Sequence, residues 1–188
     1  MLSVANLSQL PADTGAEVAF AGRSNSGKSS TLNAITGQNK LARTSRTPGR
    51  TQLINYFGLD DDRYLVDLPG FGYAKVSRSI REDWHELLDT YLSSRRSLRG
   101  LVLVTDIRHA PSDFDRDVIQ WTGAMQLPLL MLLNKADKFN RGPSLQIIAK
   151  VKAELSKQLT DHVTVQLFSA LRSQGVEEAR AWLDERLG

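Results

Sequence analysis

The residues of this chain with the most specific chemistry are the eight of Gly22-Arg23-Ser24-Asn25-Ser26-Gly27-Lys28-Ser29. They fit the pattern G-x-x-x-x-G-K-[ST] of a phosphate-binding loop, the P-loop. Its glycines let the backbone wrap around a polyphosphate with N–H groups pointing inward, and the N-terminus of a following helix adds partial positive charge. Lys28 is expected to reach the terminal phosphates, and the Ser29 hydroxyl to bind Mg²⁺. The loop predicts a polyphosphate ligand, and the choice of base must come from other residues.

A second group of residues is suited to selecting guanine, namely Asn134-Lys135-Ala136-Asp137. A carboxylate at Asp137 can accept hydrogen bonds from both N1–H and the exocyclic amine of guanine, whereas adenine offers no matching pair of donors. The stem of Lys135 can cover one face of the base, and Asn134 can brace neighbouring loops. A weaker element, Phe168-Ser169-Ala170, can give a backbone N–H to the guanine O6. The N-K-x-D pattern alone also fits an ordinary strand-to-helix turn, but together with the P-loop it predicts a guanine nucleotide.

A third group, Asp67-Leu68-Pro69-Gly70, has the chemistry to contact Mg²⁺ and the γ-phosphate. Asp67 is expected to hold Mg²⁺ through a water, and the Gly70 N–H to meet the γ-phosphate. A further Mg²⁺ ligand is expected from Thr51, with Thr47 the less favoured choice, because Thr51 begins a strand that pairs with the one leading to Asp67. Loops tied to the γ-phosphate should order with GTP and loosen with GDP.

Roles in catalysis are thus assigned to Lys28, Thr51 and Gly70, and Mg²⁺ ligation to Ser29, Thr51 and Asp67. The neighbours of Thr51 that are counted with the nucleotide site are Gly49, Arg50, Gln52 and Leu53.

The composition of the 188 residues is that of an ordinary globular protein, with 41% hydrophobic and 24% charged residues. There are no cysteines, which excludes disulfides and thiol chemistry, and the three histidines are scattered. No apolar run approaches the roughly 20 residues of a membrane span. The N-terminal stretch has Asp13 and no basic region, so a signal peptide is not expected. These features predict a cytoplasmic protein with no membrane association.

The net charge of +3 is unevenly distributed, because the whole excess lies in residues 1–100. One run of bases without an acid comprises Lys40, Arg43, Arg46 and Arg50, and a second group comprises Arg95, Arg96 and Arg99. Either group alone would be taken for a solvated face. A basic loop beside a nucleotide site favours an anionic partner such as RNA.

The pattern along the chain alternates strands and helices. Strands are predicted at 18–21, 51–59, 64–66, 101–104, 127–133 and 163–168, and helices at 30–35, 80–91, 114–125, 145–159 and 176–187. This alternation predicts a doubly wound α/β fold, in which ligands bind at the carboxyl ends of the strands. Each candidate motif falls at such an end or in the loop that follows. A single domain is expected over residues 1–188, with 1–15 as an N-terminal extension.

Taken together, these residues resemble the Ras-like translation-factor class of GTPases and, more narrowly, the EngB (YihA/YsxC-type) family of bacterial GTP-binding proteins. The segments that carry the resemblance are 22–29, 43–55, 67–74, 106–109, 134–137 and 168–169. Within the class, the segment Thr47-Pro48-Gly49-Arg50-Thr51-Gln52 is specific to the family. The resemblance implies a Ras-like P-loop G domain, with a six-stranded sheet that contains one antiparallel strand and helices on both faces. It further implies GTP or GDP with Mg²⁺, a role in assembling the large ribosomal subunit, and a link to cell division and septation.

One residue departs from the pattern of Ras-like proteins, where a glutamine after Asp-x-x-Gly orients the attacking water. Here that position is Phe71, which cannot hydrogen-bond to water, so slow hydrolysis is expected unless a partner or ion completes the site. Asn25 resembles the P-loop asparagine of potassium-activated relatives, which raises the hypothesis of a K⁺ ion; the alternative is that Asn25 only shapes the loop. Arg46 and Arg50 are candidates for arginine fingers or for RNA contacts.

Three functions remain in competition. The first is a monomeric, Mg²⁺-dependent GTPase switch whose basic loop engages ribosomal RNA or a large-subunit precursor. The second is a GTP-gated binding module with negligible hydrolysis, for which Phe71 is the decisive feature. The third is a P-loop kinase acting on a small acceptor, which residues 134–137 argue against.

Overall fold

In a computed structural model of the chain, the described residues form a sheet of seven strands, in the order β1-β3-β4-β2-β5-β6-β7, which positions the candidate site. The structure describes residues 2–4, 9–42, 53–70, 88–156 and 162–188. The strands are β1 Leu2–Val4, β2 Ala16–Gly22, β3 Ile54–Gly58, β4 Arg63–Asp67, β5 Leu98–Asp106, β6 Leu129–Asn134 and β7 Val163–Leu167. Strand β3 is antiparallel to both of its neighbours, β1 and β4, and the other neighbouring pairs are parallel.

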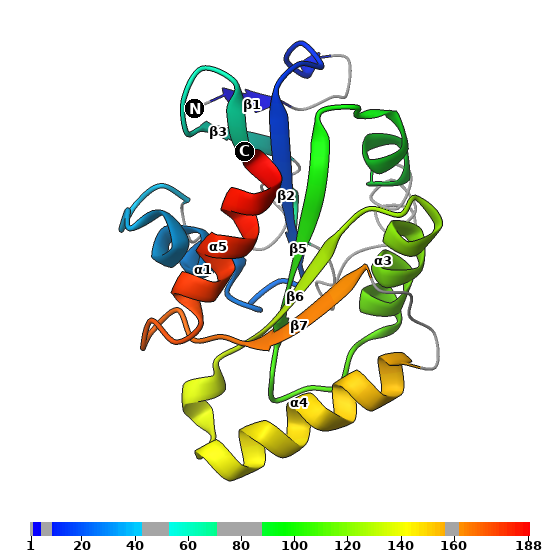
Figure 1. Ribbon diagram of the computed structural model, residues 1–188. Helices are drawn as coiled ribbons and strands as arrows, with labels where there is room; N and C mark the ends of the chain where they lie inside the picture. The colour runs from blue at the N-terminus through cyan, green and yellow to red at the C-terminus, as the bar shows by residue number, and fades with distance from the viewer. Residues whose placement is uncertain (1, 5–8, 43–52, 71–87, 157–161) are drawn as a thin grey trace.

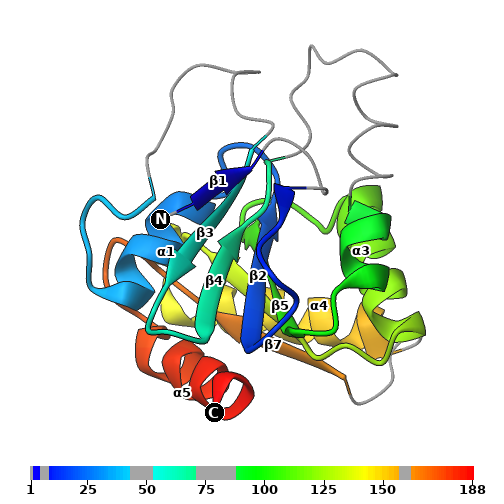
Figure 2. The ribbon, with the colours of Figure 1, turned by 90° about the horizontal axis from the view of Figure 1, so that it is seen from above.

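Helices cover both faces of this sheet. They are α1 Lys28–Thr36, α3 Asp113–Ala124, α4 Arg141–Ser156 and α5 Val176–Leu187, with a short 3₁₀ helix η2 at Ala136–Lys138, and residues 88–94 are also helical. Helices α1 and α5 lie on one side of the sheet, and α3 and α4 lie on the other (Figures 1 and 2). The fold is therefore of the predicted α/β class, a mostly parallel sheet with helices on both faces.

Each face of the sheet has its own apolar core, because alternate side chains of a strand point to opposite faces. On the α1 and α5 side, Phe20, Val102 and Leu132 pack with Leu32 and Leu183. On the opposite side, apolar residues of the same strands pack with those of α3 and α4, including Ala19, Leu103, Met131, Val118 and Leu155. Burial on both faces holds the central strands rigidly, so the loops at their carboxyl ends are fixed in relation to each other.

A buried carboxylate at Glu17, on the second residue of β2, ties several segments together. Glu17 is fully buried, and its Oε2 accepts hydrogen bonds from the hydroxyls of Tyr56 at 3.2 Å and Tyr91 at 2.8 Å. Arg95 forms an ion pair with the same carboxylate, and the Ser97 hydroxyl donates to Oε1 at 2.9 Å. A buried charge is tolerated because it is paired and hydrogen-bonded.

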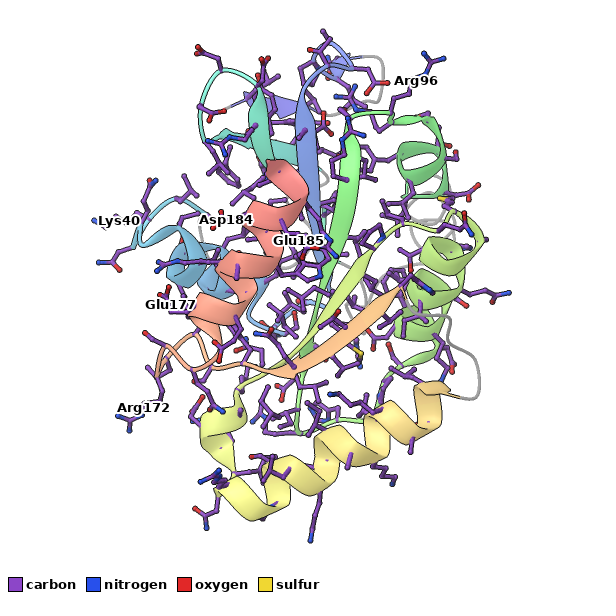
Figure 3. The ribbon with its side chains drawn as sticks, in the orientation of Figure 1. Lys40, Arg96, Arg172, Glu177, Asp184 and Glu185 are labelled. Atoms are coloured by element: carbon purple, nitrogen blue, oxygen red, sulfur yellow. The ribbon has the colours of Figure 1, made fainter. Side chains whose placement is uncertain are left out.

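This cluster corrects the prediction that residues 95–99 form a solvated basic face. The side chain of Arg95 is only 6% exposed and is used internally. Arg96 and Arg99 are exposed, as expected (Figure 3 shows Arg96 at the surface).

The number of strands was also predicted incorrectly. Strand β1, which lies in the expected N-terminal extension, pairs with β3 from Leu2 opposite Tyr56 to Val4 opposite Ile54 and makes a seventh strand. Its three residues are too few to show an alternating pattern in the sequence. In the parts of the chain that the structure describes, no helix combines the length and apolar character needed to cross a membrane.

Candidate nucleotide-binding site

The P-loop connects β2 to α1 as predicted, and its backbone conformation depends on two left-handed residues. Gly27, immediately before α1, has φ of 95°, and Asn25 has φ of 67°. A Cβ atom on Gly27 would lie 2.3 Å from the side-chain Nδ2 of Asn134. Only glycine fits there, since both the dihedral angle and the approach of Asn134 exclude a side chain.

Lys28 and Asp67, the residues predicted to contact phosphate and Mg²⁺, lie together at the carboxyl ends of β2 and β4. Their side chains form an ion pair, with Lys28 10% and Asp67 12% exposed. The two strands are parallel neighbours, and Asp67 stands beside Phe20 in the register, so their ends meet at one edge of the sheet. This explains why residues 39 positions apart in sequence share one site.

The residues predicted to bind Mg²⁺ fit such an ion by their chemistry. Ser29, in the first turn of α1, and Asp67 supply the hydroxyl and carboxylate oxygens that Mg²⁺ prefers. The third predicted ligand, Thr51, lies outside the described residues, as do Thr47, Gly49, Arg50 and Gln52. Leu53 is described and half-buried just before β3.

The Asp67-Leu68-Pro69-Gly70 segment returns to the P-loop as the prediction requires. The Leu68 N–H donates to the carbonyl of Phe20 over 3.0 Å, which continues the β2–β4 ladder beyond the strand. A Cβ built on Gly70 would lie 3.8 Å from the Gly22 carbonyl oxygen and 4.0 Å from the Ser24 nitrogen. Gly70 therefore lies against the phosphate loop. Phe71, the residue that follows, lies outside the described residues.

The guanine-selecting residues are brought to the P-loop by Asn134, the last residue of β6. Its side-chain Nδ2 donates to the Ser26 carbonyl at 2.9 Å, and its Oδ1 accepts from the Ala170 N–H at 3.3 Å. Asn134 is 2% exposed. The predicted bracing role of this residue therefore corresponds to two specific bonds, one to each flanking loop.

Lys135 makes a second connection to the P-loop. Its Nζ donates to the Asn25 carbonyl at 2.6 Å and to Asp106 Oδ2 at 2.8 Å. These two bonds join Lys135 to the P-loop and to the end of β5, and its place against one face of a base stays a prediction. The sequence alone predicts no role for Asp106, although segment 106–109 contributes to the family resemblance. Its position could have been predicted from the parallel register, which places it beside Asn134.

Asp137 is positioned to accept hydrogen bonds and is kept ionised by its neighbours. The Ser169 hydroxyl donates to Asp137 Oδ1 at 2.6 Å, and Lys138 Nζ lies 3.7 Å from Oδ2. The hydrogen bond from Ser169, with weaker contributions from Lys138 and Arg172, holds the pKa of Asp137 below its ordinary value. The carboxylate is thus in the state that guanine recognition needs.

The loop after β7 joins the same group. The Ala136 N–H donates to the Phe168 carbonyl at 3.0 Å, and the Phe168 N–H donates to the Leu133 carbonyl at 3.0 Å. The structure therefore places the predicted 168–170 segment directly against 134–137. Arg172, on the same loop, points away from the sheet (Figure 3).

Comparisons with known proteins agree with this geometry. A family model described as 50S ribosome-binding GTPase matches residues 17–135. The chain is 50% identical, over its whole length and 93% of the relative, to the probable GTP-binding protein EngB of Xylella fastidiosa strain Temecula1, and equally to that of strain 9a5c.

Solved structures show the same fold. A crystal structure of a probable GTP-binding protein EngB is similar with a TM-score of 0.69 and 23% identity, over 92% of this chain and 98% of that one. The structure of Era with MgGDPNP and nucleotides of 16S ribosomal RNA is similar with a TM-score of 0.67 and 19% identity, over 93% of this chain and 57% of that one.

Proposed function

Because the chain belongs to the EngB family of GTP-binding proteins, we propose that it is a Mg²⁺-dependent GTPase switch that binds the large ribosomal subunit or its precursor when loaded with GTP. GTP binding and GTPase activity are properties of this family. The observation that carries the ribosomal part is the match of residues 17–135 to a family described as 50S ribosome-binding GTPases. The GTPase family membership argues against the kinase alternative.

In this proposal one set of residues binds the phosphates and Mg²⁺, and another set binds the base. Lys28 neutralises the terminal phosphates, and backbone N–H groups of the P-loop and of Gly70 orient them. Ser29, and Asp67 through a water, would hold Mg²⁺, with Thr51 as the proposed third ligand, and the ion would supply positive charge at the β- and γ-phosphates. Asp137 selects guanine by accepting hydrogen bonds from its two donors. Asn134 and Lys135 hold the phosphate-binding and base-binding loops in fixed positions relative to each other.

Hydrolysis is proposed to be slow in the isolated protein. The side chain of Phe71 cannot accept or donate the hydrogen bond that orients an attacking water, and the unaided rate of Ras, on the order of 10⁻⁴ s⁻¹, shows the speed of an incomplete site. A K⁺ ion beside Asn25 is a candidate for supplying the positive charge that the site lacks near the phosphates. Equal GTP turnover in Na⁺ and in K⁺, with and without ribosomal particles, would remove this part of the proposal.

The basic segment from Lys40 to Arg50 is the proposed RNA-binding element, because four cations without an acid suit a phosphate backbone. In the sequence this segment lies between α1 and β3 and leads to Thr51, the proposed Mg²⁺ ligand, and we propose that bound GTP orders it through this ligand. In this proposal the protein acts as a cytoplasmic monomer, and its role in ribosome assembly supports normal cell division and septation.

Sedimentation with purified large ribosomal subunits tests the proposal. The protein is loaded with GDP or with a non-hydrolysable GTP analogue, and co-sedimentation is expected with the analogue only. The double variant Lys40→Ala/Arg43→Ala, at two bases of this segment that are not counted with the nucleotide site, should lose this binding and retain GTP affinity. Lys152→Ala, at an exposed position on α4, should behave like the wild type. Equal binding in both nucleotide states, or none, would refute the switch while leaving the nucleotide site intact.

A second candidate is a GTP-gated binding module that scarcely hydrolyses GTP, which Phe71 favours. Turnover measured with and without large subunits separates the two. Stimulation by the particles supports the switch, and analogue-dependent binding without stimulated turnover supports the module.

A further inference from the structure

Asp106, the last residue of β5, is at the centre of a charged cluster between the base-binding loop and the P-loop. Its Oδ2 accepts from Lys135 Nζ at 2.8 Å and from the Arg108 guanidinium at 2.6 Å. Its Oδ1 accepts from the Arg108 Nε at 2.9 Å and from the Arg108 backbone N–H at 3.0 Å. Both carboxylate oxygens are thus occupied, and the side chain is only 10% exposed.

Lys135 and Asn25, which are joined by a hydrogen bond, both have a backbone in the left-handed region. Lys135 itself has φ of 64°, Asn25 has φ of 67°, and the Lys135 ammonium donates to the Asn25 carbonyl at 2.6 Å. Neither residue is glycine, so each conformation costs free energy and persists only where surrounding contacts hold it. The ammonium bonded to Asp106 is one such contact, and it acts on both loops at once.

The peptide plane that Lys135 holds is part of the phosphate-binding turn. The Asn25 carbonyl accepts from Lys135, and the N–H of the same peptide, on Ser26, donates to the Arg23 carbonyl at 3.0 Å. Because a peptide group is planar, bonds at both of its ends fix its orientation. The next carbonyl, on Ser26, accepts from Asn134, and because the peptide is planar and trans, the Gly27 N–H points away from Asn134.

We propose that Asp106 is a positioning residue for guanine-nucleotide binding, which acts through the Lys135 ammonium to hold the Asn25 peptide of the P-loop in its phosphate-binding orientation. Asp106 lies beside Asn134 in the β5–β6 register, so the sheet fixes its distance from Lys135. Without the carboxylate, the long lysine side chain regains several rotamers, and the bond to the Asn25 carbonyl is populated only part of the time. Arg108 has an auxiliary role, because it anchors the carboxylate from the opposite side.

The charge of Asp106 is well suited to this role. Burial opposes its ionisation, but the hydrogen bonds from Arg108 and Lys135 outweigh burial and lower the pKa of the carboxyl. Asp106 therefore stays ionised at every pH at which the protein would be assayed. The side chains of Asp106, Arg108 and Lys135 help to line a cavity of about 160 Å³ next to the P-loop residues 23–26.

A double-mutant cycle on GDP release tests the proposal. Asp106→Asn removes the charge with little change of shape, and Lys135→Met removes the ammonium while keeping an apolar stem for the base. Each is expected to speed GDP dissociation by about tenfold. Lys135→Met removes the bond to the Asn25 carbonyl, and Asp106→Asn removes the charge that holds the Lys135 ammonium in place for this bond. In the double variant the rate should stay near that of Lys135→Met. Among the described residues the Asp106 carboxylate is bonded to Lys135 and Arg108, and of these Lys135 is the one with a bond to the P-loop.

Asp184→Asn is the matched control, since Asp184 is an exposed residue of α5 (Figure 3), and it should leave GDP dissociation unchanged. Effects that multiply in the double variant, to about a hundredfold, would overturn the proposal and indicate that Asp106 acts through general stability. A merely structural role would also lower the free energy of unfolding of Lys135→Met/Asp106→Asn well below that of Lys135→Met alone. The readout is nucleotide release, so ribosome binding plays no part in the result.

If Asp106→Asn does not fold, Arg108→Ala provides the same test. Arg108 is 45% exposed and its backbone N–H is retained, so a smaller increase of GDP dissociation, about two- to threefold, is expected. This increase should disappear in the Lys135→Met background. Persistence of the effect there would contradict the proposal.

Discussion

The side chain of Asn134 is bonded to the backbone of Ser26, with Nδ2 2.9 Å from the carbonyl oxygen, although 108 residues separate the two. The other end of the same amide accepts from the Ala170 N–H at 3.3 Å. One buried side chain therefore connects the phosphate loop, the end of β6 and the loop after β7. The phosphate and base parts of the site are one structural unit.

Asn134→Ala is expected to lower GDP affinity by about ten- to a hundredfold, because it removes two hydrogen bonds and leaves the buried carbonyl of Ser26 unpaired. Titration with a fluorescent GDP analogue measures the effect. Asn39→Ala, the same change at an exposed position after α1, should leave affinity unaltered. Equal affinities of Asn134→Ala and the wild type would show that the loops hold their places without this amide.

Gly27→Ala should abolish nucleotide binding. Its Cβ would lie 2.3 Å from Asn134 Nδ2, and φ of 95° is unfavourable for any residue with a side chain. Gly37→Ala is the matched comparison, since Gly37 also has a positive φ, of 68°, but the nearest atom to its Cβ is the end of the Arg180 side chain at 3.8 Å. That variant should lose about 1 kcal/mol of unfolding free energy and still bind GDP. Calorimetric titration and thermal unfolding distinguish the two outcomes.

Ser169→Ala should make GDP binding more sensitive to acid. The Ser169 hydroxyl lowers the pKa of Asp137, and guanine needs the ionised carboxylate. Affinity is therefore present above the pKa and is lost as the pH falls through it. Without the hydroxyl the pKa rises toward the ordinary value of about 3.9, so the loss begins at a higher pH. Affinities measured from pH 7 down to pH 4 should diverge from those of the wild type and of the exposed control Ser93→Ala. Parallel pH profiles would contradict the assignment.

Tyr91→Phe is expected to lower the free energy of unfolding by about 1–2 kcal/mol, since it removes the 2.8 Å bond to the buried Glu17 and keeps the ring. Urea unfolding measures this change. Tyr64→Phe removes an exposed hydroxyl bond to the Asp61 carbonyl and should cost much less. If the two variants were equally stable, the Glu17 cluster would not contribute as the structure implies.

The fold and most of the described site could be predicted because their signals are local. The P-loop and residues 134–137 each follow a buried apolar strand, and parallel strands bring their carboxyl ends to one edge. The helices α3 and α5, each with one buried face, also show the expected periodicity. For this reason the sequence alone predicts that Lys28, Asp67, Asn134 and Asp137 lie near one another.

The Glu17 cluster could not be predicted, because its partners are remote in sequence. Tyr56, Tyr91 and Arg95 lie 39, 74 and 78 residues away, and no periodicity links them. In the sequence Glu17 is only a polar residue before an apolar run, and Arg95 is one of three neighbouring bases. The role of Asp106 was missed for a similar reason, since its main partner, Lys135, is 29 residues away.

The strand order has a consequence for how the chain is made. The P-loop strand β2 lies between β4 and β5, and both of these come later in the chain, up to residue 106. A growing polypeptide therefore presents the P-loop sequence well before either neighbour of β2 exists, a delay of several seconds at about 5–20 residues per second of synthesis. During that interval the apolar residues of β2 have no native strand to pair with. Slowing translation between residues 22 and 63 should therefore increase the capture of nascent chains by chaperones.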